Sequence, residues 1–147
     1  MRMGARGPTL HELGAAVVRG SCEPGGAVVG RELRFHTTDF PRVGLGSIAL
    51  PLSPGARRPA RVVLAEPGDV LVARLGRGLE KKVCLIVDGW AAPSSSDLRI
   101  RLPAGAGAEV ADALLSPAGA ARLAATARGT GARMLGREDL LAMPLPL

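Results

Sequence analysis

Aromatic residues are nearly absent from this sequence: its 147 residues include two phenylalanines, one tryptophan and no tyrosine. Proteins that grip single-stranded nucleic acid stack the bases on several exposed rings, so this scarcity argues against such a platform and against recognition of single-stranded RNA. It also predicts a hydrophobic core built from Val, Leu, Ile and Ala. Since 47% of the residues are hydrophobic and 22% are charged, the composition is that of a folded domain.

Cysteine and histidine are scarce too, with two of each. Cys22 and Cys84 lie far apart, and neither belongs to a C-x-x-C pair or a zinc-finger spacing, so the sequence gives no disulfide framework and no usual zinc site. Both thiols are predicted to be small buried hydrophobes in a reducing compartment.

Long apolar runs are missing as well. No apolar segment follows Arg2 and Arg6, as a signal peptide would require, and no run approaches the roughly 18 apolar residues of a membrane span. We therefore expect a soluble, cytoplasmic protein with no membrane partner.

The common enzyme motifs are also missing. There is no G-x-S-x-G elbow, no phosphate-binding P-loop and no H-E-x-x-H zinc helix, and residues 44–46 and 76–78 lack the third glycine of a dinucleotide fingerprint. Cys22 and His36 could pair as nucleophile and base, but no third group is placed to orient them. We expect a protein that is not an enzyme and that has no catalytic residue, no metal and no cofactor.

Positive charge is in excess, with 19 basic against 13 acidic residues and a formal net charge of +6. All but two of the basic residues are arginines, and nine of them fall in residues 1–61 against four acidic residues. This imbalance favours a polyanionic partner, because phosphate contacts supply most of the sequence-independent affinity for nucleic acid. A solvated basic surface is the alternative on charge alone.

Short runs of aliphatic residues, separated by Gly- and Pro-rich turns, predict strands over the first two thirds of the chain. The last of them, residues 97–102, alternates Leu98, Ile100 and Leu102 with charged residues, which predicts one buried and one wet face. The six predicted strands cover residues 33–36, 47–52, 61–65, 69–75, 83–87 and 97–102.

Helical spacing of apolar residues predicts helices over residues 108–115, 117–127 and 137–142. Ser116 followed by Pro117 is typical of an N-cap with proline at the first helical position. Strands followed by helices predict an α+β fold: a small, twisted, mostly antiparallel β-sheet or partial barrel with C-terminal helices. We expect one domain over residues 1–147, strand-rich in 10–102 and helical in 107–142.

Polar and basic side chains gather in four predicted loops, where they can reach phosphates or base edges. We expect Lys81 and Lys82 to contact phosphates, and Arg74, Arg77 or Arg133 to hold a guanine edge, unless Arg74 instead pairs with a carboxylate such as Asp97. The predicted DNA contacts are Arg34, His36, Thr37, Thr38, Arg42, Arg74, Arg77, Lys81, Lys82, Ser94, Ser95, Ser96, Thr130 and Arg133.

Four segments form a series of motifs in the order of the chain: residues 35–40 (FHTTDF), 68–76 (GDVLVARLG), 95–97 (SSD) and the tail from Leu115, with LSPAG, RGTGARML, EDLL and PLP. The series resembles the target recognition domains of type I restriction-modification specificity subunits, which share a GDxLxxRxG strand and a GTG loop between helices. The first segment is similar to related adenine methyltransferases that carry the same domain.

The resemblance implies a module that reads duplex DNA for a partner adenine methyltransferase, acting alone or as a homodimer. Family subunits carry two such domains joined by long helices, and the methyltransferase motif Asn/Asp-Pro-Pro-aromatic is absent here. A single, stand-alone recognition domain is therefore the expectation, whether as a half-subunit, a detached domain or a decayed fragment.

A protein-interaction module without independent DNA binding is the alternative function. In that case the apolar tail, residues 143–147, would dock a partner, whereas a buried core strand is the structural alternative for the same residues.

Overall fold

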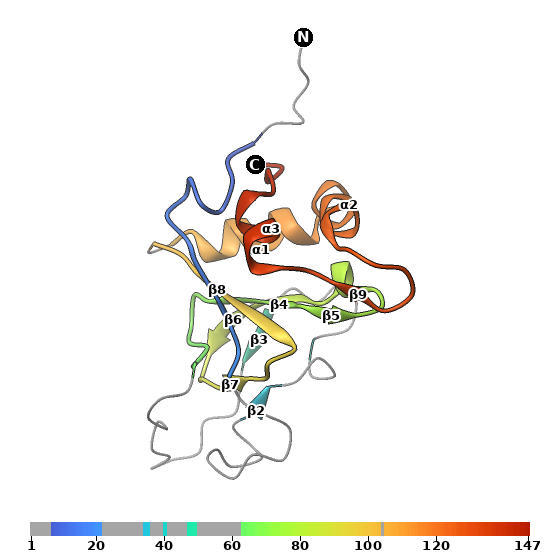
Figure 1. The fold of residues 1–147 in the computed structure, drawn as a ribbon. Helices are drawn as coiled ribbons and strands as arrows, with labels where there is room; N and C mark the ends of the chain where they lie inside the picture. The colour runs from blue at the N-terminus through green and yellow to red at the C-terminus, as the bar shows by residue number, and fades with distance from the viewer. Residues whose placement is uncertain (1–6, 22–33, 36–39, 41–46, 50–62, 104) are drawn as a thin grey trace.

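The computed structural model describes residues 7–21, 34–35, 40, 47–49, 63–103 and 105–147. A five-stranded sheet is at its centre, with helices on one face and a short pair of strands beyond the other (Figure 1). In the order β1-β8-β4-β6-β3, the strands are Ala16–Arg19, Asp97–Arg101, Val70–Ala73, Val83–Asp88 and Ser47–Ala49.

The sheet is mostly antiparallel. Strand β8 pairs antiparallel with both β1 and β4, so Ile100 lies between Val17 and Val70, and β4 pairs antiparallel with β6. Only β3 runs parallel to its neighbour β6 among these described pairs. The predicted α+β class is confirmed, and the described strands do not close into a barrel.

The three helices are α1 (Gly107–Leu115), α2 (Pro117–Thr126) and α3 (Arg137–Ala142), within one residue of the predicted bounds. Ser116 caps α2, because its hydroxyl accepts the N–H of Gly119 at 3.1 Å, and Pro117 is the first helical residue. The predicted cap is confirmed.

The main core lies between the sheet and the helices. Alternate residues of β4 and β8 point to this side, since side chains alternate across a strand, and they pack against Leu114, Leu123 and Leu140 of the three helices. Val70, Val72, Leu98 and Ile100 supply the sheet side of this core and are fully buried.

A second, smaller core covers the opposite face of the sheet. Leu71, Cys84 and Ile86 pack there with Phe35 and Ala65. The buried face predicted for residues 97–102 is confirmed at Leu98 and Ile100, whereas the predicted wet face is only partly exposed. Asp97 is fully buried, and Arg99 and Arg101 are half-buried, because the segments on this side supply their hydrogen-bond partners.

The strand predicted over residues 69–75 divides at Arg74. The N–H of Arg74 donates to the carbonyl of Ser96 at 2.7 Å, and its carbonyl accepts the N–H of Leu135 at 2.8 Å. The chain therefore leaves the main sheet, and β5 (Leu75–Gly76) pairs with β9 (Arg133–Met134) in a separate antiparallel ribbon. A 3₁₀ turn, η3 (Leu79–Lys81), follows the ribbon.

Three further predicted strands are described only in part. Strand β2 (Arg34–Phe35) pairs in parallel with β7 (Ala92–Pro93), and β3 is the described part of the prediction for residues 47–52. Of residues 61–65, only 63–65 are described, and a single bridge from Ala65 to Ala91 replaces the expected strand there.

The C-terminal tail packs into the main core. Met143 and Leu145 are buried, and the N–H of Leu145 donates to the carbonyl of Pro8 at 2.9 Å. The expectation of a docking tail is wrong for these residues, since their apolar surface is already covered; only the terminal Leu147 is exposed among the tail's large apolar residues. The alternative of a buried segment is the one the structure bears out.

Candidate functional site

A tight turn before β4 explains two residues of the sequence motif. The N–H of Asp69 donates to the carbonyl of Glu66 at 2.9 Å, and the intervening Gly68 has a φ of +94°. A type II turn needs a positive φ at its third residue, which glycine adopts readily. Gly68 is thus required by the turn itself.

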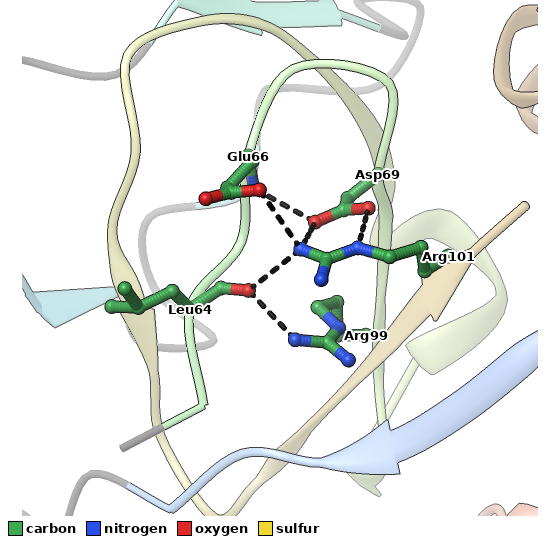
Figure 2. Close-up of polar contacts among 5 residues, drawn as sticks. All are labelled: Leu64, Glu66, Asp69, Arg99 and Arg101. Atoms are coloured by element: carbon green, nitrogen blue, oxygen red, sulfur yellow. Dashed lines mark hydrogen bonds and ion pairs between the residues drawn. The ribbon is translucent and has the colours of Figure 1, made fainter. Parts of the chain in front are cut away.

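Asp69 ties this turn to β8 (Figure 2). Its two carboxylate oxygens accept the Nε and Nη2 of Arg101 at 2.9 and 2.8 Å, and one of them also accepts the N–H of Glu66 at 2.8 Å. The hydrogen bond to this carboxylate raises the pKa of Arg101. Asp69 is 3% exposed, and its contacts are those of a residue that holds a turn.

Arg99 lies beside Arg101 and shares a backbone acceptor with it. The carbonyl of Leu64 accepts Nη1 of Arg99 at 2.9 Å and Nη2 of Arg101 at 3.3 Å (Figure 2). Burial, and then the charge of Arg101, lower the pKa of Arg99, while Asp69 and Glu66 act in the opposite direction. Two carboxylates therefore compensate this arginine pair.

The serine turn before β8, residues 94–97, closes on itself. Ser94 is 4% exposed, and its hydroxyl donates to the Asp97 carboxylate at 3.2 Å and accepts the N–H of Ser96 at 3.2 Å. Ser94 therefore shapes the turn, while Ser95 and Ser96 are half-buried. Contact of all three serines with DNA stays a prediction.

Gly20 brings the end of β1 against the serine turn. Its N–H donates to the carbonyl of Asp97 at 2.9 Å, and a Cβ at this position would lie 2.1 Å from the carbonyl oxygen of Ser94. No side chain fits there without moving the backbone. This close approach places the preceding residue, Arg19, next to the turn.

Two arginines converge on the serine turn. The carbonyl oxygen of Ser95 accepts the Nε–H of Arg19 at 3.1 Å and the Nε–H of Arg74 at 3.0 Å. Burial, and then the positive charge of Arg19, lower the pKa of Arg74. The guanidinium of Arg74 thus binds the Ser95 carbonyl, not the carboxylate of Asp97 that was the structural alternative.

The β5–β9 ribbon brings two predicted loops together. Gly76 pairs with Arg133, and a Cβ on Gly131 would lie 3.9 Å from Nη2 of Arg77. Arg77 and Thr130 are both exposed, and within the described part of the chain Arg77 has no hydrogen-bond or ion-pair partner. Residues 74–78, 94–96 and 128–135 therefore form one contiguous surface, which we call the ribbon surface.

Other predicted contacts lie at the margins of this surface. Nη2 of Arg133 donates to the carbonyl of Ala127 at 2.6 Å, which turns this guanidinium back onto its own loop. Lys81 is exposed on η3, which packs against α2, and Lys82 is half-buried directly after it. Both lysines therefore lie on the helix side of the ribbon.

The fourth predicted loop is only partly described. His36, Thr37, Thr38 and Arg42 lie outside the described residues. The backbone of Arg34 pairs with β7, and the next carbonyl, of Phe35, accepts the N–H of Ser94 at 2.8 Å. The described end of this loop thus contacts the serine turn.

Catalytic chemistry finds little support in the described residues. No group of three His, Cys, Asp or Glu side chains lies close enough there to hold a metal ion. Burial, and then the charge of Asp97, raise the pKa of the Cys84 thiol to about 12, so it is neutral and shielded. Its interpretation as a buried hydrophobe is confirmed, while Cys22 lies outside the described residues.

Among the described residues, Arg19 contacts the site although sequence reasoning missed it. The sequence signal for it is weak: an arginine directly before the glycine that ends an apolar run. Its role depends on the pairing of β1 with β8, two segments separated by more than 70 residues.

Two solved structures resemble this fold. One is the S subunit of a type I restriction-modification system from M. genitalium, with a TM-score of 0.53, 17% identity, and coverage of 93% of this chain and 32% of that chain. The chain has the fold of a target recognition domain. The other comes from a structure of the type I R-M system, with a TM-score of 0.56, 17% identity, and coverage of 99% and 35%.

The fold expected from the motifs is confirmed, and the chain spans about a third of the length of both structures. No protein-family model and no curated protein matches the sequence. None of the helices described is long and apolar enough to cross a membrane.

Proposed function

We propose that this chain is a module that recognises duplex DNA sequence for a partner adenine methyltransferase of a restriction-modification system. The observation that carries the proposal is the gathering of three polar, basic segments on the ribbon surface of a target-recognition-domain fold. Loops of this kind can place guanidinium and hydroxyl groups against phosphates and base edges.

Arg77 is the best-placed residue for reading a base. It is exposed between two glycines, and no described residue engages its planar fork, which matches the O6 and N7 acceptors of guanine. Lys81 and Lys82 carry point charges suited to phosphates at the edge of the same surface. Arg133 is a weaker candidate, because its guanidinium already holds the carbonyl of Ala127.

The proposed module contributes recognition and no chemistry. Within the described residues, no cluster of three His, Cys, Asp or Glu side chains could hold a metal ion of the kind that metal-assisted DNA cleavage uses, and Cys84 is buried. Methyl transfer or DNA cleavage by the purified chain alone would contradict this part of the proposal.

Selection of duplexes from a random library, followed by fluorescence anisotropy, tests the proposal. We expect an enriched sequence motif, and loss of binding when Arg74, Arg77, Lys81, Lys82 and Arg133 are all replaced by Gln. A variant with Arg122→Gln, which removes a charge on α2 away from this surface, should keep its affinity. Full-strength binding by the five-residue variant contradicts the assigned surface, and selection without any enriched motif contradicts sequence recognition.

A protein-interaction module is the second candidate, and one observation favours it. Leu75 and Met134 are register partners on the ribbon and are 37% and 45% exposed, an apolar pair on a basic surface. A Leu75→Ser, Met134→Ser variant that loses a protein partner while duplex binding is unchanged would support this candidate. Loss of duplex binding in the same variant would support the DNA module instead.

A further inference from the structure

Two arginine pairs among the described residues share one arrangement but differ in how their charges are compensated. In each pair two guanidiniums donate to a single backbone carbonyl: Arg99 and Arg101 to Leu64, and Arg19 and Arg74 to Ser95. A carbonyl oxygen has two lone pairs, so it satisfies one N–H of each guanidinium and leaves their charges uncompensated.

Carboxylates compensate only the first pair. Arg101 forms ion pairs with Asp69 at 2.8 Å and with Glu66 at 3.4 Å. Within the described part of the chain neither Arg19 nor Arg74 has a carboxylate partner, and no other acceptor engages their remaining N–H groups. Two adjacent positive charges therefore repel each other there, with the Arg19 side of the pair open to solvent.

The backbone around this pair is held in place. Gly20 fixes the end of β1 against the serine turn, and Arg74 is bound through both its N–H and its carbonyl. The guanidiniums therefore need little further ordering to accept a ligand. Arg74, the residue before β5, is itself part of the ribbon surface.

We propose that Arg19 and Arg74 together bind one phosphate of the DNA backbone. A phosphate supplies the missing negative charge. The planar donor fork of arginine matches the phosphate oxygens better than the point charge of a lysine would. This inference rests on the proposed function and changes one of its parts: Arg74 positions the duplex instead of reading a guanine, and Arg19 joins the interface.

Salt-dependent binding tests the shared phosphate. The logarithm of the binding constant for a duplex is measured against the logarithm of KCl concentration for wild type, Arg19→Gln, Arg74→Gln and the double variant, with Arg122→Gln as the charge-matched control on α2. We expect the double variant to reduce the slope by about one unit, since one phosphate is lost, and to weaken binding about equally on all sequences. The control should leave the slope unchanged.

Three further measurements keep the result decisive. Arg74→Lys replaces Arg74→Gln if thermal unfolding shows that the Gln variant is unstable. Because the lysine keeps the charge, this variant should retain the wild-type slope. A duplex with one neutral methylphosphonate at successive positions should show a single position at which wild type loses affinity and the double variant does not. Inorganic phosphate, added at constant ionic strength, tests whether the arginine pair binds a free anion. If phosphate protects wild type from thermal unfolding while the double variant shows no change of slope, the assignment to a phosphate of the DNA backbone is overturned.

The outcomes separate this inference from the function on which it rests. No duplex binding by wild type contradicts both. Normal wild-type binding with an unchanged slope in the double variant, or a loss of two units rather than one, contradicts only the shared phosphate.

Discussion

The carboxylate of Asp69 joins the turn before β4 to Arg101 of β8, and it is almost completely buried. Asp69→Asn keeps an acceptor for the N–H of Glu66 but removes the charge that Arg101 faces. Because the Arg101 side chain is 42% exposed and water screens part of the loss, we expect a decrease of about 1–3 kcal/mol in the free energy of unfolding. Urea unfolding monitored by circular dichroism measures it.

Glu66→Gln is the control for Asp69→Asn. Its carboxylate lies at 3.4 Å from Arg101 and is 30% exposed, so the change should cost less than about 1 kcal/mol. Equal effects of the two variants would show that Asp69 has no special role in holding the turn.

The Cys84 thiol gives a second prediction at the residue scale. Since burial and the nearby Asp97 raise its pKa to about 12, roughly one thiol in 10⁴ is ionised at pH 8, and the reactive thiolate is also shielded. In a Cys22→Ser background, Ellman's reagent should therefore not react with the native protein at pH 8, and should react fully in guanidinium chloride. Rapid reaction of the native protein would contradict the buried position.

Helix α2 depends on a local cap, which makes it a clear test at the scale of an element. The Ser116 hydroxyl accepts the N–H of Gly119 and donates to the carbonyl of Ala113 at 2.6 Å, so it links the start of α2 to the end of α1. Ser116→Ala should lower the free energy of unfolding by about 1 kcal/mol in urea titrations. Ser116→Asp, which keeps the acceptor, should recover most of that loss, and no recovery would indicate that the link to Ala113 matters more.

Local signals of this kind account for what the sequence could predict. The helices have their apolar spacing, and α2 also its cap, within a few neighbouring residues, so their bounds were predicted to within one residue. The division of the strand at Arg74 was not predictable, because it depends on Ser96 and Leu135, residues distant in the sequence. Strands of two residues, such as β7 and β9, carry no periodicity at all.

In the candidate site, too, local signals were predictable from the sequence and contacts between distant residues were not. Arg77 and Thr130 were found because glycines mark their loops, and the structure places these loops side by side. Arg19 was missed because only the pairing of β1 with β8 brings it to the serine turn. Residue type predicted the chemistry of the loops, whereas the neighbours of each guanidinium required the folded chain.

At the scale of the whole molecule, covered and open surfaces are unequally distributed. Helices and the C-terminal tail cover one face of the sheet, and the second core covers the other. The ribbon surface lies at one end of the sheet, where β1 and β4 end and β8 begins (Figure 1). Under the proposed function, we expect one copy to read a half-site.

A partner should therefore raise affinity by joining two half-sites. We expect the chain alone to bind a duplex carrying one selected half-site as tightly, per site, as a duplex carrying two. Where an adenine methyltransferase gene lies beside the gene of this chain, its product, co-expressed with the chain, should elute with it in size-exclusion chromatography. The complex should bind the two-site duplex at least about tenfold more tightly than the one-site duplex, and only at one spacing. A rigid link raises the effective concentration of the second recognition domain at its half-site.

The control is a two-site duplex whose spacer is lengthened by half a helical turn, which turns the second site away. Separate elution of the two proteins, or affinity that ignores the spacing, would contradict service to a methyltransferase while leaving half-site recognition intact.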